Sequence, residues 1–158
     1  MHWHSCSLGH VHWGRRGAAG LLLARDGMAL LQLRARWAHQ GGTWSIPGGA
    51  LERRESAVEA ALREAEEELA LMADAIVIRG SRVVDCGGWR YETVLGEPTA
   101  AISPRDLAES DGHAWVPWVE VDAYQLHPAF REAWGDPDGA LRDFVARTGT
   151  GGPSGAPT

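Results

Sequence analysis

The chain has 158 residues, of which 44% are hydrophobic and 23% charged, as in a single globular domain large enough for its own core. Its formal net charge of −6 argues against a nucleic-acid polymer as partner, because such binding relies on basic surfaces. A small anionic substrate remains compatible with this charge, since a bound cation can invert the local field.

The first 16 residues form a candidate N-terminal arm rich in histidine and tryptophan. Cys6, His10 and His12 are of types that zinc accepts, but their spacing matches no strong zinc pattern. Two interpretations stay open, a zinc site and a strand or irregular arm with surface histidines. We expect Cys6 and Cys86 to be free thiols of a cytoplasmic protein, because two cysteines form no disulfide framework.

Residues 17–148 show the patterns of one domain. In chain order they first predict two strands, Ala18–Ala24 and Met28–Arg34, joined by a turn at Asp26-Gly27. A loop at Trp37–Thr43 and a short extended segment at Trp44–Ile46 follow, and Pro47-Gly48-Gly49 breaks this segment. A helix is predicted at Glu55–Leu69. They then predict a hairpin of Ala75–Asp85 and Arg90–Leu95, a loop at Ala100–Asp111, a strand at His113–Val119 that Pro117 interrupts or ends, and helices at Val121–Gln125, Pro128–Trp134 and Asp138–Arg147.

Strands before, around and after one strong helix predict an α/β or α+β layered domain. The apolar run Ala18–Ala24 ends at Arg25, far short of the roughly 20 residues that a membrane-spanning helix needs, so we expect no membrane partner. The Gly/Pro/Ser/Thr-rich residues 149–158 predict a disordered tail.

The predicted helix carries three acidic residues at i, i+3 and i+4, namely Glu64, Glu67 and Glu68, which project from one face. Such a charge run is often only a solvated surface. Here no lysine or arginine follows any of the three at i+4, and a Pro-Gly-Gly turn lies upstream. A hard divalent cation between the carboxylates would relieve their repulsion, and magnesium prefers oxygen ligands and often bridges to substrate phosphates.

The residues around these acids resemble the Nudix box, Gly-x5-Glu-x7-Arg-Glu-aliphatic-x-Glu-Glu-x-Gly-aliphatic. Gly49 and Glu55 stand at its first two fixed positions, and Arg63 to Leu71 match the remainder. One departure is Ala70, which replaces the glycine of the family. Alanine there either adopts a left-handed conformation at a cost of about 1 kcal/mol or lets the helix run on into Leu71-Met72.

The resemblance implies an α/β/α sandwich with a mixed central sheet and a hydrolase acting on a nucleoside diphosphate linked to another moiety. Carried onto this chain, it makes Glu64, Glu67 and Glu68 the metal-binding and catalytic acids, with the Gly48 carbonyl as a further ligand. The expected ion is Mg²⁺, with Mn²⁺ as a substitute. Gly49, Glu55 and Arg63 would support the box, with Arg63 and Glu55 bracing the loop before the helix.

The resemblance says less about the functions of residues outside the box. Arg34 resembles an arginine that contacts phosphates in MutT-like members, or it is a solvated arginine at a strand end. Glu109 is the candidate general base, with Asp111 as an alternative, and both could be surface carboxylates of the loop. Trp115 is a candidate for stacking on the base, whereas His39 and His127 fit solvated loop positions better than a cleft.

The leading functional hypothesis is a MutT-like (d)NTP pyrophosphohydrolase, monomeric or homodimeric. ADP-ribose, sugar nucleotides and dinucleoside polyphosphates are alternative substrates that would use the same acids. A non-catalytic nucleotide sensor on the Nudix fold is the alternative of another class, against which the intact acids argue.

Overall fold

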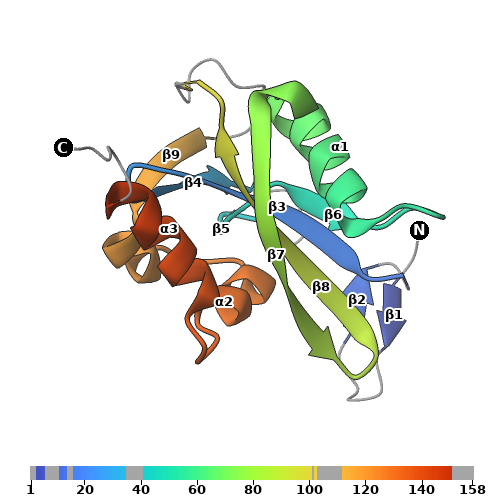
Figure 1. Cartoon of the computed structure of the whole chain (residues 1–158). Coiled ribbons are helices and arrows are strands. Elements are labelled where there is room, and N and C mark those ends of the chain that lie inside the picture. Colours follow the sequence, from blue (N-terminus) through green and yellow to red (C-terminus); the bar gives the residue numbers. More distant parts are fainter. Residues whose placement is uncertain are drawn as a thin grey trace.

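The computed structural model describes residues 3–5, 11–13, 16–34, 41–100, 102 and 112–150. Within these ranges β1 (Trp3–Ser5) pairs with β2 (Val11–Trp13) as a separate antiparallel sheet. Seven further strands in the same ranges form one mixed sheet (Figure 1). They are β3 (Ala18–Arg25), β4 (Met28–Leu33), β5 (Trp44–Ser45), β6 (Gly48–Ala50), β7 (Ile76–Cys86), β8 (Trp89–Pro98) and β9 (Gly112–Pro117).

The main path of the sheet runs β5-β4-β3-β8-β7, with β9 along the other edge of β4. Among the described strands of this sheet, β3 and β8 pair in parallel and the other strand pairs are antiparallel. Asp26 and Gly27 join β3 to β4 with φ of 55° and 79°, the conformation of a tight hairpin turn. Gly87 and Gly88 join β7 to β8 in the same way, with φ of 53° and 93°.

β3 and β4 separate after this turn, because they pair only at Ala24↔Ala29 and Arg25↔Met28. The segment 44–50 fills the opening. Its first part, β5, pairs with β4, and its last part, β6, pairs with β3. Between them the Leu21 N–H donates to the Pro47 carbonyl at 2.9 Å. The two glycines of β6 therefore lie in the middle of the sheet, beneath the helix that follows.

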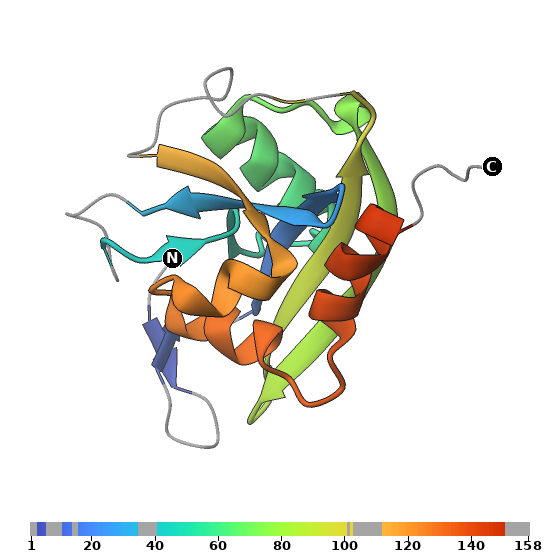
Figure 2. The same cartoon turned by 90° about the vertical axis from the view of Figure 1, so that its left-hand side faces the viewer.

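Helices cover both faces of the sheet (Figures 1 and 2). On one face lies α1 (Ala57–Leu69), and on the other lie α2 (Pro128–Trp134) and α3 (Ala140–Thr150). β3 is buried along nearly its whole length because both of its faces are covered. Leu21 and Leu23 point into the core beneath α1, and Leu22 points into the core beneath α2 and α3. The predicted α/β/α sandwich with a mixed sheet is confirmed.

α1 begins with a capping box, in which Ser56 and Glu59 each accept a backbone N–H from the other. It ends at Ala70, which has φ 57° and ψ 32° and donates its N–H to the carbonyls of Ala65 and Glu66. Of the two alternatives for this residue, the structure takes the left-handed cap. A short 3-10 helix, η1 (Ala73–Ala75), leads from there to β7.

The remaining differences from the predicted elements are at element ends, with two exceptions. Gly48 and Gly49 do not break the extended segment but continue it as β6, because β3 supplies hydrogen-bonding partners that local propensity cannot anticipate. The helix expected at Val121–Gln125 is the 3-10 helix η3 (Trp118–Ala123). α3 reaches Thr150, so the first two residues of the expected tail are helical.

Some predictions lie outside the described residues. They concern the disorder of residues 151–158, the side chains of the N-terminal arm, His39, most of the loop Ala100–Asp111, and both thiols. Among the residues that the structure describes, no helix combines the length and apolar character required to cross a membrane.

Candidate active site

Arg63 links the loop before α1 to the helix and to β6. Its guanidinium pairs with both carboxylate oxygens of Glu55, with Nε at 2.7 Å from Oε2 and Nη2 at 3.0 Å from Oε1. Nη2 also donates to the Ala50 carbonyl at 3.2 Å, and Nη1 donates to Glu64 Oε2 at 3.0 Å. The hydrogen bonds from Arg63 lower the pKa of Glu55. The pairing expected between Arg63 and Glu55 is therefore present, in the bidentate geometry that an arginine favours.

Glu64 lies directly against the backbone of β6. A Cβ atom on Gly49 would stand 2.4 Å from Glu64 Oε2, closer than any non-bonded contact allows. Only glycine at position 49 leaves room for this carboxylate, whose side chain is 14% exposed. The first glycine of the motif thus serves the close approach of helix and strand rather than a special φ.

Glu68, one turn further along α1, lies next to Glu64 and faces β4. Its Oε1 accepts a hydrogen bond from Gln32 Nε2 at 2.6 Å, and the Gly48 N–H also donates to its carboxyl group. Burial, followed by the hydrogen bond with Glu64, raises the pKa of Glu68 well above its ordinary 4.5, although the donors Gln32 and Gly48 oppose the shift. The raised pKa favours the neutral form of Glu68 when no cation is bound. We call the carboxyl groups of Glu64 and Glu68 the acid pair.

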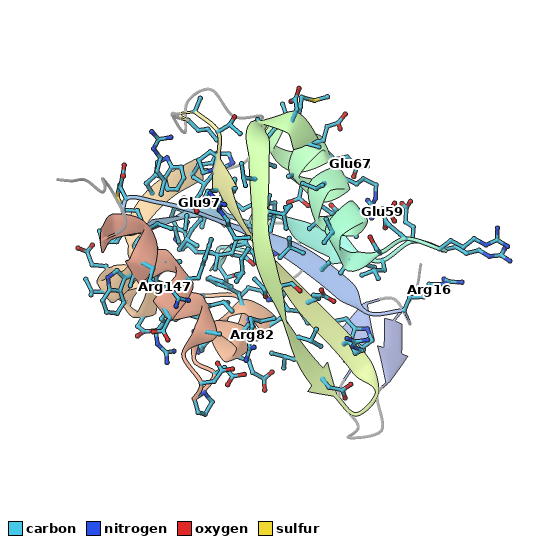
Figure 3. The ribbon with its side chains drawn as sticks, in the orientation of Figure 1. Arg16, Glu59, Glu67, Arg82, Glu97 and Arg147 are labelled. Atoms are coloured by element: carbon cyan, nitrogen blue, oxygen red, sulfur yellow. The ribbon has the colours of Figure 1, made fainter. Side chains whose placement is uncertain are left out.

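Glu67 does not join this acid pair. Its side chain is 59% exposed, its Oε1 lies 3.5 Å from Arg63 Nη1, and it projects from the outer side of α1 (Figure 3). Arg63 stands one turn earlier on the helix and attracts the carboxylate toward itself. The same nitrogen of Arg63 donates to Glu64, so Glu67 lies on the side of α1 that carries Glu64 but is the more exposed of the two.

β4 and β9 contribute two side chains to the site, Gln32 and His113, that the sequence analysis did not identify as candidates. Gln32 is 7% exposed and lies directly opposite His113 in the β4–β9 pairing, so the two share a face of the sheet. Burial lowers the pKa of His113. Gln32 interrupts an otherwise apolar strand, but the burial that singles it out is visible only in the structure.

Arg34 follows β4 two residues beyond Gln32 and lies near the site. Its charge and that of Glu68 act in opposite directions on the pKa of Tyr91, which burial raises. The Tyr91 hydroxyl occupies the space that a side chain at Gly20 would need, since a Cβ atom there would lie 2.5 Å from it. Tyr91 is thus a further polar group close to the acid pair that the sequence pattern did not reveal.

Trp115 and His127 have structural contacts. Trp115 packs against the core beneath α1, and its Nε1 donates to the Ile102 carbonyl at 2.9 Å. His127 caps α2, where its Nδ1 accepts the Ala129 N–H at 3.1 Å. Glu109 and Asp111, the candidates for the general base, lie outside the described residues.

The acid pair fits a hard divalent cation. Glu64 and Glu68 offer oxygen ligands of the type that magnesium prefers, and a bound cation would favour the ionised form of Glu68. The described residues contain no preformed group of three or more His, Cys, Asp or Glu side chains arranged as a metal site. Because Glu67 points outward, a third carboxylate ligand from α1 requires its side chain to turn inward.

Comparisons with known proteins agree with this geometry. The family model described as NUDIX domain matches residues 14–136. A Mycobacterium tuberculosis protein named "Putative 8-oxo-dGTP diphosphatase 3" is 40% identical over 143 residues, which cover 84% of this chain and 66% of that protein. The chain thus spans slightly less than two thirds of that relative.

Solved structures resemble the fold. The crystal structure of a Nudix hydrolase from M. smegmatis, RenU, has a TM-score of 0.77 and 36% identity, covering 92% of this chain and 94% of that one. A C. elegans Ap4A hydrolase in a binary complex has a TM-score of 0.57 and 18% identity, covering 80% and 92%. At that identity the second likeness concerns the fold alone.

Proposed function

Because the chain belongs to the Nudix family, we propose that it is a Mg²⁺-dependent pyrophosphohydrolase of the MutT type, acting on a (d)NTP. The observation that carries this proposal is the half-buried acid pair of Glu64 and Glu68 against the glycines of β6. The relative named for 8-oxo-dGTP supports a nucleoside triphosphate as the substrate class, with an oxidised purine nucleotide as the first candidate.

In this proposal Glu64 and Glu68 hold the ion, with Glu67 and the Gly48 carbonyl completing its ligands. When bound, the ion neutralises charge on phosphate oxygens and lowers the pKa of a coordinated water. Mn²⁺ can take its place. Arg63 keeps Glu64 pointed at β6 through the 3.0 Å hydrogen bond and is itself fixed by Glu55. Gly49 supplies the space for the Glu64 carboxylate.

The substrate groups are assigned on weaker grounds. The sequence contains no lysine, so the phosphates would be contacted by arginine, and Arg34 is the arginine that lies near Glu68 and Tyr91. Glu109 remains the proposed general base, with Asp111 as its alternative. Trp115 is a weaker candidate for stacking on the base, because its indole N–H already bonds to Ile102.

A nucleotide panel with Mg²⁺ tests the proposal. The compounds are 8-oxo-dGTP, the ordinary dNTPs, ADP-ribose, a nucleotide sugar and a dinucleoside polyphosphate, and the readout is release of phosphate or pyrophosphate. We expect a triphosphate to be cleaved with release of pyrophosphate. Glu64→Gln should abolish nearly all turnover, whereas Glu66→Gln, an exposed acid on the same helix, should leave it unchanged.

Other results of the nucleotide panel would favour another substrate or a function as a nucleotide sensor. Cleavage of only ADP-ribose, the nucleotide sugar or the dinucleoside polyphosphate would replace the triphosphate by that substrate. Nucleotide binding in calorimetry without cleavage of any compound would make the chain a sensor.

A further inference from the structure

Gln32 is a buried polar residue whose side chain is only half satisfied. Its Nε2 donates to Glu68 Oε1 at 2.6 Å, whereas its Oε1 has no hydrogen-bond partner among the described residues. In this orientation the amide nitrogen faces the carboxyl group of Glu68, and the amide oxygen is left without a partner among those residues. The exposed fraction of the residue is 7%, so bulk water does not satisfy this oxygen.

A buried acceptor without a hydrogen-bond partner destabilises the folded state, because it has lost its hydration and gained nothing in return. Methionine or leucine at this position would avoid that penalty and would continue the apolar pattern of β4, which reads Met-Ala-Leu-Leu-Gln-Leu. An amide oxygen accepts hydrogen bonds but cannot donate them. Its missing partner must therefore bring an N–H or an O–H group, which the carboxylates of Glu64 and Glu68 do not offer when ionised.

We propose that Gln32 is a positioning residue for the acid pair, with its Nε2 holding the Glu68 carboxylate and its Oε1 accepting a hydrogen bond from a water of the hydrated divalent cation. The inference rests on the proposed function only in taking the ion to bind between Glu64 and Glu68. Second-sphere groups of this kind orient carboxylate ligands and tune metal affinity. A hydrated cation held by Glu68 would bring O–H donors next to the carboxyl group that Gln32 contacts at 2.6 Å.

NMR spectroscopy tests this on the unaltered protein. The chain has three glutamines and no asparagine, so its side-chain amide region contains three NH₂ pairs, from Gln32, Gln40 and Gln125. Gln40→Met and Gln125→Met identify the Gln32 pair by elimination. Titration with Mg²⁺ alone should shift the Gln32 pair and leave that of the exposed Gln125 in place. If the chemical shifts of the Gln32 pair do not change at saturating Mg²⁺, the proposal is overturned. If they change only when nucleotide is added, the amide oxygen contacts the nucleotide and not the hydrated cation, which also overturns the proposal.

Substitution gives a second, independent readout. Gln32→Met preserves approximate volume and removes both polar groups. We expect its affinity for Mn²⁺ alone, followed by calorimetry, to fall about 10–100-fold. Leu31→Met is the matched control, because it is the next residue of β4, is buried and faces the opposite core. Its Mn²⁺ affinity should equal that of the wild type.

Kinetics separates positioning from substrate binding. With saturating metal, Gln32→Met should lower kcat about 10–100-fold and leave KM for the nucleotide within about twofold. A folded Gln32→Met protein with wild-type Mn²⁺ affinity and wild-type kcat overturns the proposal. Should no nucleotide be hydrolysed at all, the proposed function fails, yet the response of Gln32 to Mg²⁺ alone would still stand, so the two failures are distinguishable.

Discussion

At the scale of single residues, the site depends on one close contact between a helix and a strand. Glu64 lies against β6 because Gly49 has no side chain, and Arg63 holds the carboxylate there through a hydrogen bond. The same arginine is neutralised by Glu55, so the loop, the helix and β6 form one braced unit. Removing any member changes where the Glu64 oxygens lie.

Gly49→Ala should therefore affect activity more than stability. The new Cβ atom would lie 2.4 Å from Glu64 Oε2 and would displace that carboxylate from β6. Overpacking of this kind lowers the free energy of unfolding by about 1–3 kcal/mol, and we expect affinity for Mn²⁺ to fall at least tenfold. Gly112→Ala is the control, because a Cβ atom there meets nothing within 4 Å. Equal metal affinity in the two variants, measured by calorimetry, would contradict the role of the contact.

Glu68 gives the ligand-free protein a specific dependence on pH. Its pKa is raised in the folded state, chiefly by burial, so the folded protein binds more protons than the unfolded chain above pH 4.5. The free energy of unfolding contributed by this group is thus fully present below pH 4.5 and declines as pH rises through the folded-state pKa. Glu68→Gln should flatten this decline in urea titrations without metal. A variant that retains the wild-type slope would show that Glu68 is not the group responsible.

At the scale of elements, the C-terminus of α1 carries the one departure from the family pattern. Ala70 is exposed and has φ 57°, a conformation in which alanine is strained by about 1 kcal/mol and glycine is not. The strain lies at the end of the helix that presents Glu64 and Glu68. No metal-binding group is altered by it.

Ala70→Gly should raise the free energy of unfolding by about 1 kcal/mol, which corresponds to roughly 2–4 °C in Tm for a chain of this length. Calorimetry in the absence of metal measures the change. Ala123→Gly, at an exposed alanine without positive φ, should instead leave stability unchanged or lower it. If the two variants shifted Tm alike, relief of left-handed strain would not be the cause.

Local sequence signals predicted the elements whose conformation depends on their own residues. Asp26-Gly27 and Gly87-Gly88 marked both hairpins because these turns need positive φ. The strand β6 was missed because Gly48 and Gly49 favour turns locally, and only pairing with β3 makes them extended. In the site, the helical spacing found the acids, and the contact of Glu67 with Arg63 is also local, since the two residues lie one turn apart on α1. The burial of Gln32 depends on tertiary neighbours that no local pattern contains.

At the scale of the whole molecule, the site lies where the sheet opens. β3 and β4 diverge, segment 44–50 enters between them, and α1 lies over the junction. One half of the site thus comes from β4 and β9 and the other from β6 and α1. β3 and β4 pair directly at only two positions. A ligand that contacts both halves of the site would therefore add a connection between the two parts of the sheet.

Mg²⁺ should consequently stabilise the whole fold against heat. An ion that binds only the folded state adds about 2.7 kcal/mol at a concentration 100 times its Kd, or several degrees in Tm. The shift should grow between pH 6 and pH 8, because the raised pKa of Glu68 makes proton and cation compete for the acid pair. The double variant Glu64→Gln/Glu68→Gln should show no shift, while Glu66→Gln should respond as the wild type does. A wild-type Tm that ignores Mg²⁺ across this pH range, in differential scanning calorimetry, would count against a cation site at the acid pair.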